Sequence, residues 1–345
     1  MNLELLKRIC EAPGAPGYEN KIRDLVINEI KDHVDEYFID NMGSVVALIK
    51  GQEQKKVMVS AHMDEIGFIV TNIDDNGFIK FHTLGGFDPK TLTAQRVIIH
   101  GKEDVIGVMG SKPIHIMEPD ERLKAPQIKD FFIDTGRSGK EIKELIEIGN
   151  PITRERSLIE MGDNINCKSL DNRASVYVLV EAIKKISNPS TDVYAVFSVQ
   201  EEVGIRGANV AAHQINPDFG ICLDTTIAFD VPGAAEHETI TKLGKGVAIK
   251  VMDSMTICDQ RMVAFMKKIA IKNKLDYQLE VLTAGGTDTS GIQRMGKNGS
   301  IAGAISIPTR HIHQVIEMAN RKDIKLAIEL LCQCLNEIGN HEWEF

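Results

Sequence analysis

The chain has 345 residues, a length that suggests roughly two domains. Apolar residues make up 43% and charged residues 26%, as in ordinary globular proteins, and the net charge of −9 argues against binding to nucleic acid or to an anionic membrane surface. No apolar stretch approaches the ~20 residues that span a bilayer, and the start, MNLELLKRICEAPG, lacks a signal-peptide pattern, so we expect a cytoplasmic protein.

The first 66 residues begin with two predicted helices and continue with two predicted strands. Apolar residues recur at steps of three and four over 3–12 and 19–36, and this spacing predicts a helix in each range. The Val-rich runs SVVALIKG and KKVMVSAHMD are bounded by turn residues and predict buried strands. This order of elements indicates the start of an α/β domain.

The character of the sequence changes between residues 67 and 158. Short β-like runs such as GFIVTNI and QRVIIHG follow one another, and Asp-Asn-Gly at 75–77 predicts a hairpin turn. One helix is expected in this region, over about 139–148. We therefore predict that 67–158 is an inserted all-β domain with a barrel-like architecture.

Helices and strands alternate again from residue 159 onward. The predicted strands are DVYAVFSVQEE, DFGICLDTT, GVAIKVMD, YQLEVLT and SIAGAISIP, and the predicted helices are ASVYVLVEAIKKI, TICDQRMVAFMKKIAIKNK and DIKLAIELLCQCLNEIG. Continuous apolar strands between helices favour a sheet that is covered on both faces. The predicted fold class is α/β, with a mixed sheet sandwiched by helices in a domain made of 1–66 and 159–345.

Five acidic or histidine-containing segments lie at the ends of predicted strands or just before a helix. They are SAHMDE at 60–65, SLDNR at 169–173, QEEVG at 200–204, ICLD at 221–224 and PTRHIH at 308–313. Each segment alone has an ordinary structural explanation, such as a helix N-cap or a solvated loop. Ligands in open α/β sheets gather at the carboxyl ends of strands, so the shared position favours one common site.

These segments contain more metal donors than a single ion needs. The donors are His62, Asp171, Glu202, Asp224 and His313. Two imidazoles and three carboxylates exceed what one zinc ion usually takes from protein, and they favour two divalent ions about 3.5–4 Å apart that share a carboxylate. Mixed nitrogen and oxygen ligands favour Zn or Co, with Mn as an alternative, over Ca.

Two short patterns suggest how the remaining carboxylates act. Asp64 follows His62 by two residues, so on a strand both side chains project to the same face and Asp64 can orient the imidazole. Glu201 and Glu202 are adjacent at the end of a buried strand. One of two adjacent acids can bind a cation while the other stays unligated and accepts a proton.

Six stretches of the chain resemble those of the M42 metallo-aminopeptidases, whose self-compartmentalised members are called tetrahedral aminopeptidases. They are SAHMDEIGFIV, SLDNRASV, QEEVGIRGA, CLDTT, TAGGTDTSGI and IPTRHIH. The stretches occur in the family order, and the resemblance covers essentially the whole chain. The chain departs from the family in one place, because Tyr is more frequent there than His311.

The resemblance implies a role for each matching residue. Asp171 would bridge two metal ions, and Glu201 would be the general base. His62 and Asp224 would complete one metal site, Glu202 and His313 would complete the other, and Asp64 would be the partner of His62.

The resemblance also implies a zinc-peptidase-like catalytic domain that removes N-terminal residues from short peptides. The activated water would lose its proton to Glu201. The inserted domain 67–158 would contribute to dimer contacts, and dimers would assemble into a dodecamer. Arg206, Asp288 and His311 are candidates for the substrate pocket, but the sequence does not determine which N-terminal residue is preferred.

Three other functions compete with this interpretation. A related metal-dependent deacylase or carboxypeptidase would use the same donors, and a binding or assembly protein would need none of them. An endoglucanase would need Glu201 and Glu202 as its acid pair, yet glycosidase carboxylates lie roughly 5–9.5 Å apart across a sugar, which sequence neighbours rarely achieve. The single Trp also leaves few platforms for sugar stacking. The six cysteines form no CxxC pair and are expected to be free thiols.

Overall fold

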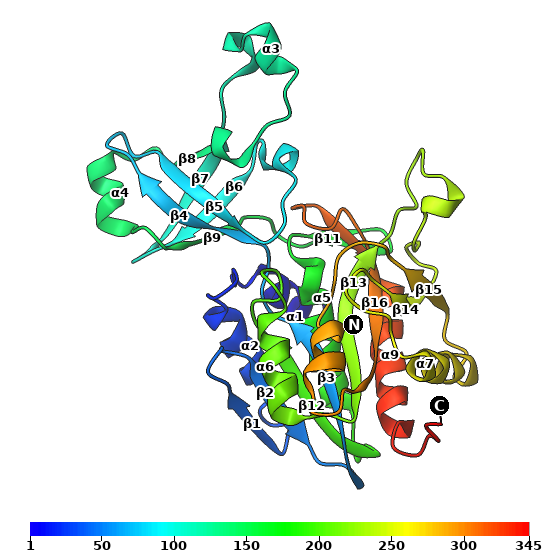
Figure 1. Cartoon of the computed structure of the whole chain (residues 1–345). Coiled ribbons are helices and arrows are strands. Elements are labelled where there is room, and N and C mark those ends of the chain that lie inside the picture. Colours follow the sequence, from blue (N-terminus) through cyan, green and yellow to red (C-terminus); the bar gives the residue numbers. More distant parts are fainter. Residues whose placement is uncertain (345) are drawn as a thin grey trace.

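The computed structural model describes residues 1–344, and position 345 of the predicted catalytic domain lies outside the described residues. It contains one large mixed sheet between helices and a separate closed barrel (Figure 1). This architecture confirms the predicted fold class. No helix within 1–344 is long and apolar enough to cross a membrane.

The large sheet has eleven strands among the described residues. In spatial order they are β1 (Glu36–Ile39), β2 (Val45–Ile49), β12 (Thr191–Ser198), β3 (Glu53–His62), β13 (Phe219–Ile227), β16 (Ile301–Arg310), β17 (Glu317–Asn320), β11 (Asn164–Cys167) and β10 (Ile159–Met161), with β14 (Val247–Met252) and β15 (Tyr277–Val281) joined through β16. The four central strands β12, β3, β13 and β16 are parallel to one another. Their carboxyl ends therefore meet at one edge of the sheet.

Helices cover both faces of this sheet, as the alternating apolar pattern requires. One face packs against α1 (Leu3–Glu11), α2 (Asn20–Ile30), α5 (Leu170–Lys185), α7 (Gln260–Lys272) and α9 (Arg321–Glu337). The other face packs against α6 (Arg206–Ile215) and α8 (Thr289–Met295). In β2, for example, Val45 and Ala47 belong to the first core and Val46 to the second, because successive side chains of a strand point to opposite faces.

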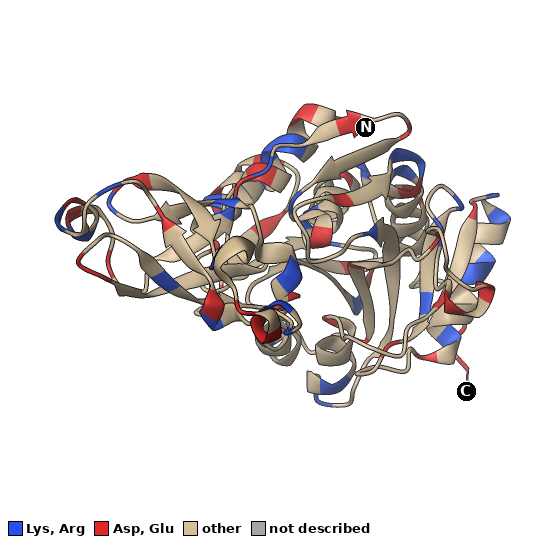
Figure 2. Cartoon of the chain, turned by 90° about the horizontal axis from the view of Figure 1, so that it is seen from above, with Lys and Arg blue, Asp and Glu red and all other residues tan. Residues whose placement is uncertain are grey.

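The barrel closes in the order β4–β5–β8–β7–β6–β9 and has an apolar core of its own. Its strands are β4 (Gly67–Ile73), β5 (Ile79–Leu84), β6 (Arg96–His100), β7 (Asp104–Gly110), β8 (Phe132–Asp134) and β9 (Pro151–Arg154), and its helices are α3 (Pro119–Arg122) and α4 (Gly139–Leu145). The α3 segment projects from the barrel in Figure 1. Seen from above in Figure 2, the barrel extends to one side of the sheet domain, and acidic and basic residues are interspersed on both.

Several elements differ from the sequence prediction. The helix expected over 19–36 ends at Ile30, because the chain then turns into the edge strand β1. Helix α6 was not predicted: its packing face is made of small residues, chiefly Ala208, Ala211 and Ala212, which give a weak periodic signal. The barrel strands run from Gly67 to Arg154, within the predicted insertion, while the exact domain boundaries stay predictions. All six cysteines are buried and free, as expected.

Candidate active site

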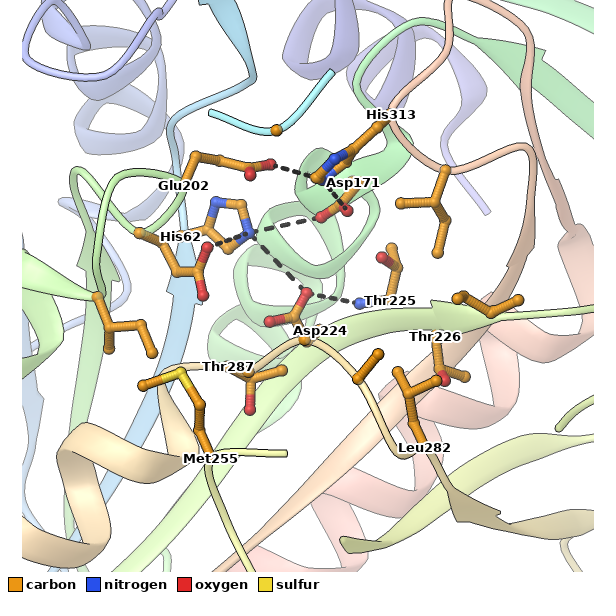
Figure 3. A pocket seen from close by; sticks show the side chains of 18 of the residues that line it. His62, Asp171, Glu202, Asp224, Thr225, Thr226, Met255, Leu282, Thr287 and His313 are labelled. Atoms are coloured by element: carbon orange, nitrogen blue, oxygen red, sulfur yellow. Dashed lines mark hydrogen bonds and ion pairs between the residues drawn. The ribbon is translucent and has the colours of Figure 1, made fainter. Parts of the chain in front are cut away.

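The carboxyl ends of the four central strands carry most of the residues that the sequence singled out. His62 is the last residue of β3, and Asp224 lies near the end of β13. Glu201 follows β12, and His313 follows β16. Asp171 enters from the start of α5, so five distant segments converge on one place (Figure 3).

Asp171 lies between two histidines. Its Oδ1 is 3.5 Å from Nε2 of His62, and its Oδ2 is 3.5 Å from Nε2 of His313. Each histidine has a second carboxylate nearby: Asp224 Oδ1 lies 3.9 Å from His62 Nε2, and Glu202 Oε1 lies 3.3 Å from His313 Nε2. The five side chains thus form two groups that share Asp171.

These separations fit ligands of a common ion. Two atoms that bind zinc at about 2.1 Å in tetrahedral directions lie about 3.4 Å from each other. Ligand atoms of His62, Asp171 and Glu202 also lie within 4.8 Å of one another. The donor set, with imidazole nitrogen and carboxylate oxygen in both groups, therefore fits a pair of divalent ions.

The start of α5 explains how Asp171 reaches this position. The first turn is irregular, with Asp171 at φ −79° and ψ 106°, so its carboxylate does not cap the helix. The next residue, Asn172, donates from Nδ2 to the carbonyl of Leu223 on β13 at 2.9 Å. This bond ties the beginning of the helix to the strand that carries Asp224.

Asp64 connects the His62 side of the site with the Glu201 loop. The carbonyl of Asp64 lies 3.1 Å from Nδ1 of His62, and a carbonyl can only accept, so Nδ1 carries a proton and Nε2 is the atom that would bind a metal. The carboxylate of Asp64 accepts hydrogen bonds from the backbone N–H groups of Glu201 and Glu202, both at 3.0 Å. One residue therefore orients the imidazole and the adjacent acids.

We expect the Asp64→Asn variant to lower metal affinity by about 10-fold to 100-fold, because the amide accepts at one oxygen only and its NH₂ group faces a backbone N–H. Titration of the metal-free protein with Zn²⁺ against a competing chelator measures this change. Asp40→Asn is the matched control, since Asp40 also accepts from backbone N–H groups but in a turn between β1 and β2. Equal affinity in Asp64→Asn and in the control would contradict the orienting role.

The carboxylates of the site raise the pKa values of both histidines. Burial alone would lower the pKa of His62, but Asp171 and Asp64 raise it well above its usual range. Burial opposes protonation of His313 too, yet Glu202 and Asp171 raise its pKa to about 11. The carboxylates of the site thus favour positive charge on both imidazoles, and a divalent cation would compensate the same negative charges.

Glu201 and Glu202 have different surroundings despite being adjacent. Glu202 lies 3.3 Å from His313, whereas Glu201 lies 3.9 Å from Nε2 of His62. Burial raises the pKa of the Glu201 carboxyl well above its usual range, against the charge of His62 and with added repulsion from Asp224. A carboxylate with a raised pKa is suited to accept a proton near neutral pH.

The site opens into a cavity of about 520 Å³. Beyond the residues described above, its wall is made of threonine and apolar side chains together with the buried Lys250. The labelled members in Figure 3 are Thr225, Thr226, Met255, Leu282 and Thr287. Lys250 pairs with Asp253 and Glu280, each at 3.1 Å, so buried carboxylates compensate its charge.

The three candidates for the substrate pocket lie outside the residues that line this cavity. Arg206 is exposed and donates to Oε1 of Gln200 at 3.2 Å, and His311 is also exposed. Asp288 is buried and accepts a hydrogen bond from Ser198 at 2.6 Å, which places it behind the cavity wall. Their contact with substrate stays a prediction.

Two features of the site were missed from the sequence. Lys250 comes from the middle of β14, where a single Lys within an apolar run gives no signal of a paired, buried cation. Glu317 begins β17 and accepts hydrogen bonds from the backbone N–H groups of Asp171 and His313, both at 2.9 Å. Its spacing of four residues from His313 suggested no role, because the contact depends on how β17 pairs.

Comparison with known proteins identifies the family. A family model described as "M42 glutamyl aminopeptidase" matches residues 43–330. The chain belongs to the M42 family of aminopeptidases. The resemblance found in the sequence is therefore confirmed, and the protein is a peptide hydrolase of a family that cleaves N-terminal residues and depends on metal ions.

M42 relatives match along nearly the full chain. A "Putative aminopeptidase" of Acetivibrio thermocellus is 40% identical over 96% of this chain and 98% of its own length. The structure of an aminopeptidase from Desulfurococcus kamchatkensis is 38% identical with a TM-score of 0.93, covering 97% of this chain and 94% of that one. The TET1 peptidase of Pyrococcus horikoshii, which can assemble into a tetrahedron or a large octahedral shell, is 30% identical with a TM-score of 0.87, covering 97% and 99%.

Proposed function

We propose that this M42 enzyme is a di-metal aminopeptidase in which Asp171 would be shared by two divalent ions, Zn or Co, with Mn as an alternative. His62 and Asp224 would complete one site, and Glu202 and His313 the other. The observation that carries the proposal is that the two oxygens of Asp171 face two different imidazoles at 3.5 Å.

The residues of the site suggest a division of labour. When bound, the ions supply Lewis acidity, which polarises a peptide carbonyl and lowers the pKa of water from about 15.7 towards about 7. Glu201 accepts the proton of the attacking water and passes it to the leaving amine. Asp64 holds the backbone of Glu201 and the ring of His62 in place for this transfer.

The cavity supports cleavage at the N-terminus of a peptide. The charge of a free α-ammonium group is attracted to the acidic cluster around Glu201 and Asp224. The threonine and apolar walls leave room for the first side chain beside the reacting carbonyl. Short peptides are therefore the proposed substrates.

We also propose that the chain associates with itself, as dimers that assemble into a dodecamer. The TET1 peptidase of Pyrococcus horikoshii forms a closed assembly, which supports the idea. The barrel exposes large apolar side chains in two places. Ile106 lies on β7, and Ile114, Ile116 and Leu123 lie in the projecting segment around α3. Such side chains are typical of surfaces that become covered by a partner. The cytoplasmic location stays a prediction from the sequence.

Activity on a panel of aminoacyl anilides tests the enzymatic proposal. We expect the protein to lose activity when a chelator removes the metal and to regain it when Zn²⁺, Co²⁺ or Mn²⁺ is added back. N-acetylated peptides, which lack the charged amine, are the control and should not be cleaved. Activity that survives complete metal removal, or equal cleavage of blocked and free peptides, would overturn the proposal, and carboxymethylcellulose serves as the glycosidase control.

A further inference from the structure

Two loops that follow β14 and β15 form one wall of the active-site cavity. Met255 belongs to the first loop, and Leu282 and Thr287 belong to the second. In the view of Figure 3, these three side chains lie across Asp224 from His313. A peptide whose first carbonyl lies at the metal donors would therefore have room to place its first side chain against this wall.

Hydrogen bonds between the two loops hold this wall in place. The backbone N–H of Leu282 donates to the carbonyl of Met252 at 3.0 Å. The hydroxyl of Thr287 donates to Oδ2 of Asp253 at 3.4 Å, and both of these residues are buried. The wall is thus formed before a ligand arrives, as in most small-molecule sites, so its chemistry can be compared directly with that of a substrate side chain.

Most of the cavity lining carries no charge. Among the described residues that line the cavity, only the metal donors, Glu201 and Lys250 have ionisable side chains. The other lining residues are glycine, threonine and apolar residues, and the apolar ones are Ile205, Ile227, Met255, Leu282, Ala284 and Ile312. Apolar surface favours an apolar side chain, whereas a charged side chain would lose its hydration there without gaining a partner. The charge preference of this wall therefore depends on Lys250.

The ammonium group of Lys250 is already paired on both sides. Its Nζ lies 3.1 Å from Oδ2 of Asp253 and 3.1 Å from Oε1 of Glu280. Both carboxylates are buried, and neither residue lines the cavity. An acidic substrate side chain would compete with two carboxylates for one ammonium group, and a basic side chain would approach a like charge. The wall thus disfavours first residues of either charge.

We propose that this wall receives the first side chain of the peptide and that the enzyme prefers an uncharged, apolar first residue, such as leucine or methionine, over a glutamate or a lysine. The inference rests on the proposed aminopeptidase function and names its substrate class. Glu280 is then a positioning residue for specificity: it touches no substrate and acts by compensating the charge of Lys250.

Steady-state kinetics of the metal-loaded native protein on leucyl, methionyl, glutamyl and lysyl anilides tests the preference. We expect kcat/KM for the leucyl and methionyl substrates to exceed that for the two charged substrates by about 10²-fold. A higher kcat/KM for the glutamyl or lysyl substrate than for the leucyl one would overturn the inference and leave the aminopeptidase function standing. Failure to cleave any of the four would refute the proposed function and the inference with it.

The Glu280→Gln variant tests the role of the compensated lysine. It removes one of two compensating charges at nearly constant size, and neither oxygen of Glu280 accepts a hydrogen bond among the described residues. We expect the ratio of kcat/KM for the glutamyl substrate to that for the leucyl substrate to rise about 10-fold, because Lys250 then has a single carboxylate partner. Glu29→Gln is the matched control, since Glu29 pairs with Lys184 at 2.7 Å and neither residue lines the cavity. The same ratio in both variants would refute the role of Lys250.

The Leu282→Glu variant tests the position of the first side chain and remains informative if Glu280→Gln does not fold, because Leu282 is partly exposed in a loop. The new carboxylate should raise the ratio of kcat/KM for the lysyl substrate to that for the leucyl substrate by about 10-fold. Leu279→Glu is the matched control, because Leu279 is 47% exposed on β15 and is not among the residues that line the cavity. An unchanged ratio in Leu282→Glu would show that the first side chain does not reach this wall and would overturn the proposal.

Discussion

Replacing Glu201 with Gln is expected to lower kcat by about 10²-fold to 10⁴-fold while the protein keeps its metal. The amide cannot accept the proton of the attacking water, and it has nearly the same size as the carboxylate. Glu201 is well placed for this role, since its carboxylate lies 3.9 Å from His62 and its pKa is raised by burial. Steady-state kinetics on an aminoacyl anilide, with elemental analysis of bound metal, measures both quantities.

The adjacent residue provides the contrast for this experiment. Glu202 lies 3.3 Å from His313 and is a proposed ligand, so Glu202→Gln should lose metal as well as activity. The two variants differ by one position in the chain and make the same chemical change. Near-normal turnover in Glu201→Gln, or loss of metal from it to the same extent as from Glu202→Gln, would show that the roles are assigned incorrectly.

Replacing Asp171 with Asn is expected to weaken metal binding at both proposed sites, because both groups of donors share this residue. The amide keeps one oxygen for one of the two histidine groups and presents an NH₂ group, which cannot bind a cation, to the other. With the shared negative charge also lost, both ions should bind more weakly. The loss of Lewis acidity removes several kcal/mol of transition-state stabilisation, or about 10³-fold in rate. Elemental analysis after dialysis, together with kinetics, measures the two effects.

Asp323→Asn is the matched control for Asp171→Asn. Asp323 is fully buried, and it accepts hydrogen bonds from the backbone N–H groups of Gly244 and Gly246 without contacting the donor set. We expect the Asp323→Asn variant to hold as much metal as the native protein, even if the variant is less stable. If Asp171→Asn retained the metal content and the rate of the control, the shared-carboxylate arrangement would be wrong.

The sequence predicted the convergence of the donor segments because of a simple geometric rule. Apolar runs that alternate with helices form parallel strands, and parallel strands place their carboxyl ends at one edge of a sheet. His62, Asp224 and Glu201 therefore had to lie near one another once their strands were recognised. The roles of these residues in binding and catalysis stay predictions that the variants above test.

The sequence was less informative wherever a contact depends on pairing or on local backbone direction. Arg206 follows Glu202 by four residues, but it begins α6, its side chain is exposed beside Gln200, and it is not among the residues that line the cavity. The hydrogen bonds of Asp64 to Glu201 and Glu202 depend on the register of β3 against β12. A one-residue slip of either strand would turn these side chains to the other face.

The sequence by itself determined the family, the order of helices and strands in outline, the β region within 67–158 and the set of candidate metal donors. These properties follow from local patterns, namely apolar periodicity and short motifs, which the chain carries at every stage of folding. Only the tertiary structure decided that Asp171 faces two imidazoles, that buried carboxylates compensate the charge of Lys250 in the cavity wall, and that Glu317 accepts hydrogen bonds from the backbone of Asp171 and His313. Such contacts join residues far apart in the chain, and their distances depend on strand register and domain packing, which no local pattern encodes.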